Sequence, residues 1–167
     1  MLDDFESWEE HTELLERGNY VGLVAYCEAE VARKPGDLHA MERLGEAYVL
    51  NGEYEKAIDA MEPCHREYPD ICAFPNIILD ALFAMGQTEN DFRWSARPAI
   101  LRLSSKVADI CYNFLRRKRK PRLIGELYVE LLINAYLMFT EEELMQLLQS
   151  DPRFLVEDER VRRKPIA

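Results

Sequence analysis

A recurrence at a step of 34 residues constrains this chain more than any other feature of its sequence. Gly18-Asn19-Tyr20 recurs as Gly52-Glu53-Tyr54, and Gly86-Gln87-Thr88 follows at the same step. Pro35 and Pro69 are also separated by 34 residues. Self-similarity at such a period is typical of repeated units that stack on one another and bury a shared core.

The repeated unit is clearest between Leu38 and Asp70, where two helical patterns flank Asn51-Gly52. Three residues of the first helical pattern lie on one face of the predicted helix. One of them is Gly45, whose small size allows a neighbouring helix to approach closely. Pro69 ends the second pattern, because proline cannot continue a helix and restricts the residue before it. The face-to-face positions are Leu44, Gly45 and Tyr48 in the first helix, and Ala57, Met61 and Cys64 in the second.

This unit resembles a tetratricopeptide (TPR) repeat, whose pattern is met by Met41, Leu44-Gly45, Tyr48, Ala57, Met61, Cys64 and Pro69. The resemblance covers residues 4–90, about two and a half repeats. The first repeat has Glu10-His11 where the family has Leu-Gly, as expected of a terminal capping repeat. The third departs from the pattern after Gly86, and Pro98 interrupts its second helix, so residues 91–98 are predicted to form a joint.

Charge divides the chain at the same joint. Residues 1–97 contain 21 acidic and 8 basic residues, whereas residues 98–167 contain 10 acidic and 13 basic residues. With 48% hydrophobic and 31% charged residues, the composition is that of a folded protein. We therefore predict two domains, a TPR-like region over 1–97 and a helical domain over 98–167.

The second domain shows three helical patterns, over residues 105–118, 122–134 and 140–149. Thr140 and Glu143 form a capping box at the start of the third. The segment from Asp151 to Val156 then indicates a turn into a short strand. This order resembles a winged-helix or related helix-turn-helix domain, with a wing hairpin in residues 157–167 or an all-helical relative as the alternatives. The predicted fold class is all-α.

The TPR resemblance implies a concave groove lined by the first helix of each repeat. Its centre would be acidic and its edges aromatic, which favours a basic or apolar partner segment. Alternatively, the aromatic residues pack beneath the C-terminal domain. The predicted groove positions are Phe5, Trp8, Thr12, His39, Glu42, Glu46, Val49, Asn76, Asp80 and Phe83.

A basic run precedes the second helix of the C-terminal domain, formed by Arg116, Arg117, Lys118, Arg119, Lys120 and Arg122. Such a run suggests nucleic acid, an acidic partner or a nuclear address. It is also consistent with a solvated helix end, where cations suit the helix dipole. A third alternative is that this run, or the basic tail 160–164, docks on the acidic groove. The third helix begins Thr-Glu-Glu-Glu, which would repel phosphates, so any contact would be to the nucleic-acid backbone without sequence readout.

The sequence contains none of the motifs that we associate with catalysis: no glycine-rich phosphate loop, no paired histidines on a helix and no nucleophile elbow. Cys64 and His65 point about 100° apart on a helix, so a metal site with Cys72 is not expected. We predict no cofactor, no metal and no membrane contact, with a cytoplasmic location. The expected function is a non-enzymatic protein-interaction adaptor; the alternative is a nucleic-acid-associated or transcription-regulatory protein.

Overall fold

The structure is a computed structural model of the chain. It describes residues 2–94, 98–116, 118 and 120–164, with side chains from residue 9 onward. The chain divides into two compact units, Met1–Arg97 and Pro98–Ala167. Both units are mainly helical, and each is described by itself.

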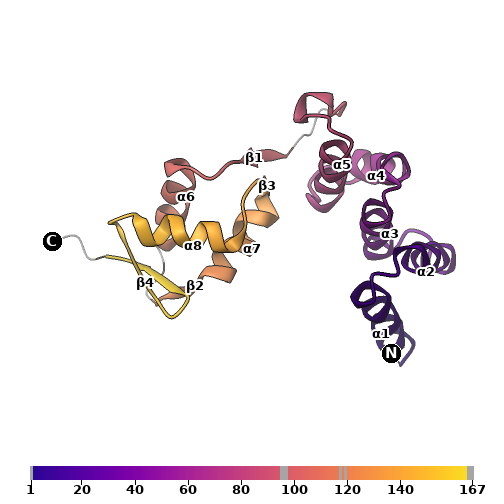
Figure 1. Cartoon of the computed structure of the whole chain (residues 1–167), viewed down its shortest axis with the longest axis horizontal. Coiled ribbons are helices and arrows are strands. Elements are labelled where there is room, and N and C mark those ends of the chain that lie inside the picture. Colours follow the sequence, from indigo (N-terminus) through magenta and orange to yellow (C-terminus); the bar gives the residue numbers. More distant parts are fainter. Residues whose placement is uncertain (1, 95–97, 117, 119, 165–167) are drawn as a thin grey trace. The chain divides into compact units, whose positions relative to one another are not determined.

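Unit 1 is a succession of antiparallel helical hairpins (Figure 1). Each helix packs against the next one along the chain, and α3 also contacts α5. This packing is compatible with a helical repeat, in which each helix contacts its neighbours in the stack. The helices are α1 (Leu2–Glu16), α2 (Tyr20–Arg33), α3 (Leu38–Leu50), α4 (Tyr54–Glu67) and α5 (Ala73–Ala84).

The 34-residue period has its physical origin in the turns that follow α1, α3 and α5. Gly18, Gly52 and Gly86 have φ angles of 65°, 77° and 75°. A Cβ atom at any of the three would have no heavy atom within 4 Å. The backbone conformation, rather than lack of space, therefore selects glycine here, because side-chain-bearing residues rarely adopt positive φ.

Close packing between α3 and α4 depends on the small residue predicted at the interface. Leu44, Gly45 and Tyr48 are buried on α3, and Ala57 and Met61 are buried on α4, as expected. A Cβ atom on Gly45 would lie 2.6 Å from the Met61 sulfur atom and 2.9 Å from its methyl carbon. The Met61 side chain thus occupies the space that a larger residue at position 45 would need.

A buried ion pair joins the first hairpin to the second. Glu30 on α2 is 3% exposed, and Arg43 on α3 reaches it with Nε at 3.2 Å and Nη2 at 3.0 Å. The hydroxyl of Tyr48 donates to Glu28 at 2.8 Å nearby. Two charge-assisted contacts therefore connect α2 and α3 in addition to their apolar packing.

The third hairpin lacks a second α-helix among the described residues. A short 3₁₀ turn, η1 (Glu89–Asp91), follows α5 and begins with a Thr88–Asp91 capping box. Phe92 is then buried against His65 of α4, with ring centroids 5.8 Å apart, and Trp94 packs on Phe92 at 5.0 Å. The predicted departure from the pattern after Gly86 is confirmed up to Trp94; residues 95–97 lie outside the described range.

Unit 2 contains strands that an all-α assignment omits. Its helices are α6 (Ser105–Leu115), α7 (Ile124–Asn134) and α8 (Glu141–Ser150), and the Thr140–Glu143 capping box is confirmed. β1 (Ala99–Leu101) pairs in parallel with β3 (Ala135–Leu137). β2 (Arg122–Leu123), β4 (Phe154–Glu157) and β5 (Arg160–Arg163) form an antiparallel sheet in the order β2-β5-β4 (Figure 1).

Two predicted helix boundaries in unit 2 are wrong. Arg122 and Leu123, expected at the start of a helix, lie in β2, because their backbone pairs with β5. The helix expected to reach Lys118 ends at Leu115.

The turn of the β4–β5 hairpin is formed by Asp158 and Glu159, with φ angles of 49° and 59°. Neither is glycine, which is why the sequence carried no strong turn signal.

The core of unit 2 lies between the three helices and the antiparallel sheet. Val161 is fully buried on the middle strand, while Arg160 and Arg162 on either side of it are exposed. Side chains alternate between the two faces of a strand, so one buried residue suffices to orient β5. The core residues are Val107, Ala108, Cys111, Leu115, Ile124, Leu127, Leu131, Phe139, Leu144, Leu148, Phe154 and Val161.

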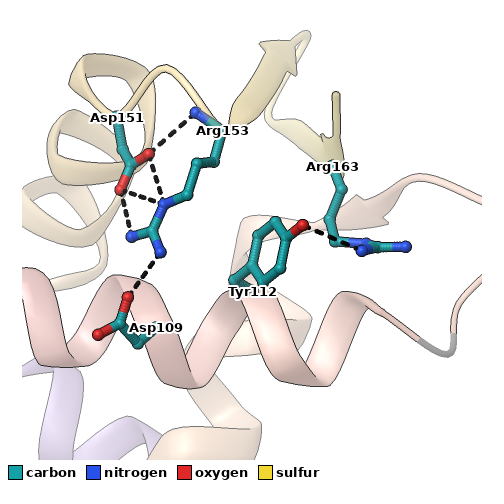
Figure 2. A network of polar contacts seen from close by, with 5 residues as sticks. All are labelled: Asp109, Tyr112, Asp151, Arg153 and Arg163. Atoms are coloured by element: carbon teal, nitrogen blue, oxygen red, sulfur yellow. Dashed lines mark hydrogen bonds and ion pairs between the residues drawn. The ribbon is translucent and has the colours of Figure 1, made fainter. Parts of the chain in front are cut away.

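A polar network attaches the sheet to α6 (Figure 2). The Arg153 guanidinium donates to both carboxylate oxygens of Asp151 and, at 2.6 Å, to Asp109 of α6. It also lies 5.5 Å from the ring centre of Tyr112. Arg163 stacks on the same ring at 5.0 Å and donates to its hydroxyl at 3.2 Å. Both strands of the β4–β5 hairpin are thereby held against α6 at the end that lies away from the turn.

Candidate functional site

The predicted acidic positions of unit 1 come together on α3 and α5. Glu42 and Glu46 lie one turn apart on α3, and Asp80 lies on α5, which packs against α3. Glu42 is half-buried, whereas Glu46 and Asp80 are exposed. His39 is exposed, with its Nδ1 atom 3.6 Å from Glu42. We call Glu42, Glu46 and Asp80 the acidic face.

The electrostatics of Glu46 show that these carboxylates act on one another. The residue is exposed overall, but surrounding protein removes part of the water from its carboxylate, and this raises the pKa of Glu46. Repulsion from Glu42 and then from Asp80 raises the pKa further, while Arg43 opposes the shift. A cation placed at this face would relieve the repulsion.

Glu46 should therefore reduce stability at neutral pH. Its pKa is higher in the folded chain than in the unfolded chain, so ionising it opposes folding once the pH exceeds the unfolded value. We expect Glu46→Gln to raise the melting temperature at pH 7, and the gain to disappear near pH 3, where the Glu46 carboxyl group is protonated in both the folded and the unfolded chain. Thermal melts followed by circular dichroism at the two pH values measure this.

Glu55→Gln on α4 removes the same charge from an exposed position and serves as the matched control. An equal gain in both variants would assign the effect to the chain's net charge of −10 rather than to the acidic face.

The remaining predicted groove positions surround the acidic face. Thr12 on α1 is exposed, and Val49 on α3 and Phe83 on α5 are half-buried. Asn76 on α5 is half-buried, and its Oδ1 atom accepts no hydrogen bond from a described residue. Phe5 and Trp8 lie in α1, but their side chains are outside the described residues.

The predicted basic run occupies the end of α6, the following loop and β2. Arg116, Lys118 and Lys120 are exposed, and the Lys118 amino group lies 5.0 Å from the ring centre of Phe114. Arg122 instead is half-buried in β2, with Nη1 at 3.5 Å from Glu126. Arg117 and Arg119 lie outside the described residues.

A second basic segment, Arg160 to Lys164, begins beside Arg122 and Leu123 in the structure. The sequence alone did not indicate that the two basic segments are neighbours. β2 pairs with β5, so that Arg122 lies opposite Val161 and Leu123 opposite Arg160. Arg162 and Lys164 follow Val161 and are exposed. The cluster Arg160 to Lys164 is visible in the sequence as a basic tail, but its place beside Arg122 and Leu123 depends on strand pairing.

Burial works against activation of three cysteine thiols, those of Cys27, Cys64 and Cys111. Burial raises the pKa of Cys27 and of Cys111 to about 11, with Glu30 adding to the shift at Cys27. Burial also raises the pKa of Cys64. These thiols are neutral at pH 7, whereas the nucleophile in thiol chemistry is the thiolate. Within the described ranges, no group of three His, Cys, Asp or Glu side chains is placed to hold a metal ion.

An apolar cavity of about 320 Å³ lies between α6, α7 and the β1–β3 pair. Leu101, Phe114 and Leu131 are among its apolar walls, and Glu130 and Asn134 are its polar lining residues. The adjacent α7 residues Val129 and Ile133 are more than half exposed. This lining suits contact with apolar groups and supplies no reactive side chain.

Comparison with protein-family models, with curated proteins and with solved structures finds no match to this chain. Among the described residues, no helix has the length and apolar character required to cross a bilayer. The two charged surfaces are therefore the candidate functional sites of the chain.

Proposed function

We propose that this chain is a non-enzymatic adaptor in which unit 1, a TPR-type array, binds a basic segment of a partner protein on the acidic face. The main support for this proposal is that Glu42, Glu46 and Asp80 lie together on two helices that pack against each other. Half-buried Val49 and Phe83 on the same two helices offer apolar contacts at its margins.

The 34-residue glycine period and the Gly45–Met61 contact support the TPR assignment. The element order β1-α6-β2-α7-β3-α8-β4-β5, in which β2, β4 and β5 form an antiparallel sheet, supports a winged-helix-like unit 2. An adaptor needs no reactive groups, and we propose that the protein acts in the cytoplasm by binding alone.

The partner chemistry follows from charge. Residues 1–97 carry a net charge of −13, and the acidic face concentrates part of it at a partly desolvated position. A lysine- or arginine-bearing segment would gain from each carboxylate, whereas an acidic segment would be repelled. A helical ligand would present its cations at positions i, i+3 and i+4 toward α3 and α5.

Three synthetic amphipathic helices test this proposal, identical in their apolar face and bearing lysine, glutamine or glutamate on the other. We expect the lysine peptide to bind the full chain best in fluorescence anisotropy. Glu46→Lys should weaken it about tenfold or more, because it places like charges together. Glu55→Lys on α4 makes the same charge reversal away from the acidic face and should change affinity far less.

Equal binding of the lysine and glutamine peptides, with no effect of Glu46→Lys, would contradict the basic-ligand proposal and indicate apolar recognition. Equal loss in both charge-reversal variants would show that only overall charge matters.

A further inference from the structure

We propose that unit 2 binds the phosphate backbone of double-stranded nucleic acid through the end of its antiparallel sheet that lies away from the hairpin turn. This surface, the basic end, consists of Arg116, Lys118 and Lys120 together with Arg162 and Lys164. It is a second binding function, independent of the peptide-binding role proposed for unit 1.

Two segments distant in sequence supply the basic end, the first with Arg116, Lys118 and Lys120 and the second with Arg162 and Lys164. Because β2 is antiparallel to β5 and Arg122 lies opposite Val161, the chain enters β2 at the same end of the sheet at which it leaves β5. Arg163 contacts Tyr112, which places the last turn of α6 beside the same end of β5. Arg116 follows Tyr112 by four residues and so lies one turn further on that helix face.

Within the described part of the chain, the cations of the basic end form no ion pair with a carboxylate. These cations are Arg116, Lys118, Lys120, Arg162 and Lys164. The nearby carboxylates Asp109 and Asp151 are both held by Arg153 (Figure 2). Unit 1 differs, because Arg17, Arg33, Arg43, Lys56 and Arg66 all lie in ion pairs there. An unpaired cluster of this kind is available to a polyanion.

The opposite end of the sheet is acidic, which determines the direction of approach. Asp158 and Glu159 form the hairpin turn, and Glu157 precedes them at the end of β4. Glu141 and Glu142, from the first turn of α8, line one hollow together with Glu159. Phosphates would be repelled from this end and from the start of α8. The ligand therefore contacts the sheet end and the loop, and α8 does not read base edges.

The aromatic side chains near the basic end favour a duplex over a single strand. Tyr112 is covered by the guanidinium groups of Arg153 and Arg163, and Phe114 lies beneath Lys118. Single-strand binders need open aromatic faces on which bases stack. Cations without a stacking surface make backbone contacts, which are independent of sequence and strongly salt-dependent.

The test is binding of the full chain to a fluorescent 20-base-pair duplex between 50 and 200 mM NaCl. If all five cations contact phosphates, log K should fall against log salt with a slope of about −4 to −5. The double variant Arg162→Gln with Lys164→Gln should bind more weakly, with a slope about 2 shallower. Lys120→Gln alone should make the slope about 1 shallower. This single variant keeps the proposal testable if the double variant unfolds.

The matched control is Lys106→Gln, which removes one exposed cation from the first turn of α6. Position 106 lies ten residues from Arg116, about 15 Å along the helix and beyond the Debye length of about 10 Å at 0.1 M salt. Its slope should equal that of the parent chain. Circular dichroism melts of every variant confirm that the fold is retained.

Four results of the nucleic-acid measurements would overturn the proposal. These are no duplex binding at 50 mM NaCl, binding without salt dependence, tighter binding to the single strand than to the duplex, and an equal effect of the Lys106→Gln and Lys120→Gln variants. Equally tight, equally variant-sensitive binding to poly-glutamate would also overturn it and assign the basic end to an acidic protein.

Discussion

Replacing Val161 with aspartate is expected to unfold unit 2. Val161 has no exposed surface and lies on the middle strand, between β2 and β4. A carboxyl group there either ionises without a partner or takes up a proton and remains unpaired, at a cost of at least about 3 kcal/mol. A unit of about 70 residues rarely has more than 3–5 kcal/mol of stability, so the substitution removes most of it.

Tryptophan fluorescence makes this result easy to read, because both tryptophans, Trp8 and Trp94, belong to unit 1. In Val161→Asp, the urea transition seen by fluorescence should persist, while amide hydrogen exchange across α6, α7 and α8 becomes fast. Arg162→Asp introduces the same residue on the exposed face of the same strand and should leave exchange slow. A parallel loss of the fluorescence transition would show instead that the two units unfold together.

The second large effect concerns the contact between Gly45 and Met61 in unit 1. Gly45→Leu should destabilise the α3–α4 hairpin, because the new side chain needs space that Met61 fills. We expect overpacking to cost about 1–3 kcal/mol, partly offset by about 1 kcal/mol of improved helix propensity. Met61→Ala should cost about 2–5 kcal/mol, because Met61 is fully buried and the truncation leaves a cavity.

A double-mutant cycle by urea denaturation tests whether the two residues share one space. Gly45→Leu combined with Met61→Ala should be more stable than the sum of the single effects by at least about 1 kcal/mol. Ala29→Leu adds the same side chain at an exposed position of α2 and should change stability by less than about 0.5 kcal/mol. Strict additivity in the cycle would contradict this packing.

Features of the fold that depend on short stretches of chain could be predicted from the sequence. The glycine turns, the Gly45 contact face and the Thr140 capping box each rest on local backbone conformation or helical spacing. Pro63 shows the limit of local rules. It lies inside α4 although proline disfavours a helix interior, because packing of α4 against α3 and α5 outweighs the lost hydrogen bond.

The two proposed surfaces differ in how much of them the sequence could reveal. The acidic face follows from the 34-residue register, which brings Glu46 and Asp80 to equivalent positions on successive first helices. The basic end does not, because Lys120 and Lys164 are 44 residues apart and only the β2–β5 pairing brings their segments together.

The sequence by itself determined the helical repeat, its turns and the division of charge between the two halves, because periodicity, glycine conformation and composition are local properties. Only the tertiary structure determined where the strands form and how they pair. Ala99–Leu101 pairs with Ala135–Leu137 across an intervening α6 and α7, and Arg160–Arg163 is ordered by a single buried valine. Such short strands gain their backbone hydrogen bonds from partners distant in sequence, so neither segment carries the signal alone.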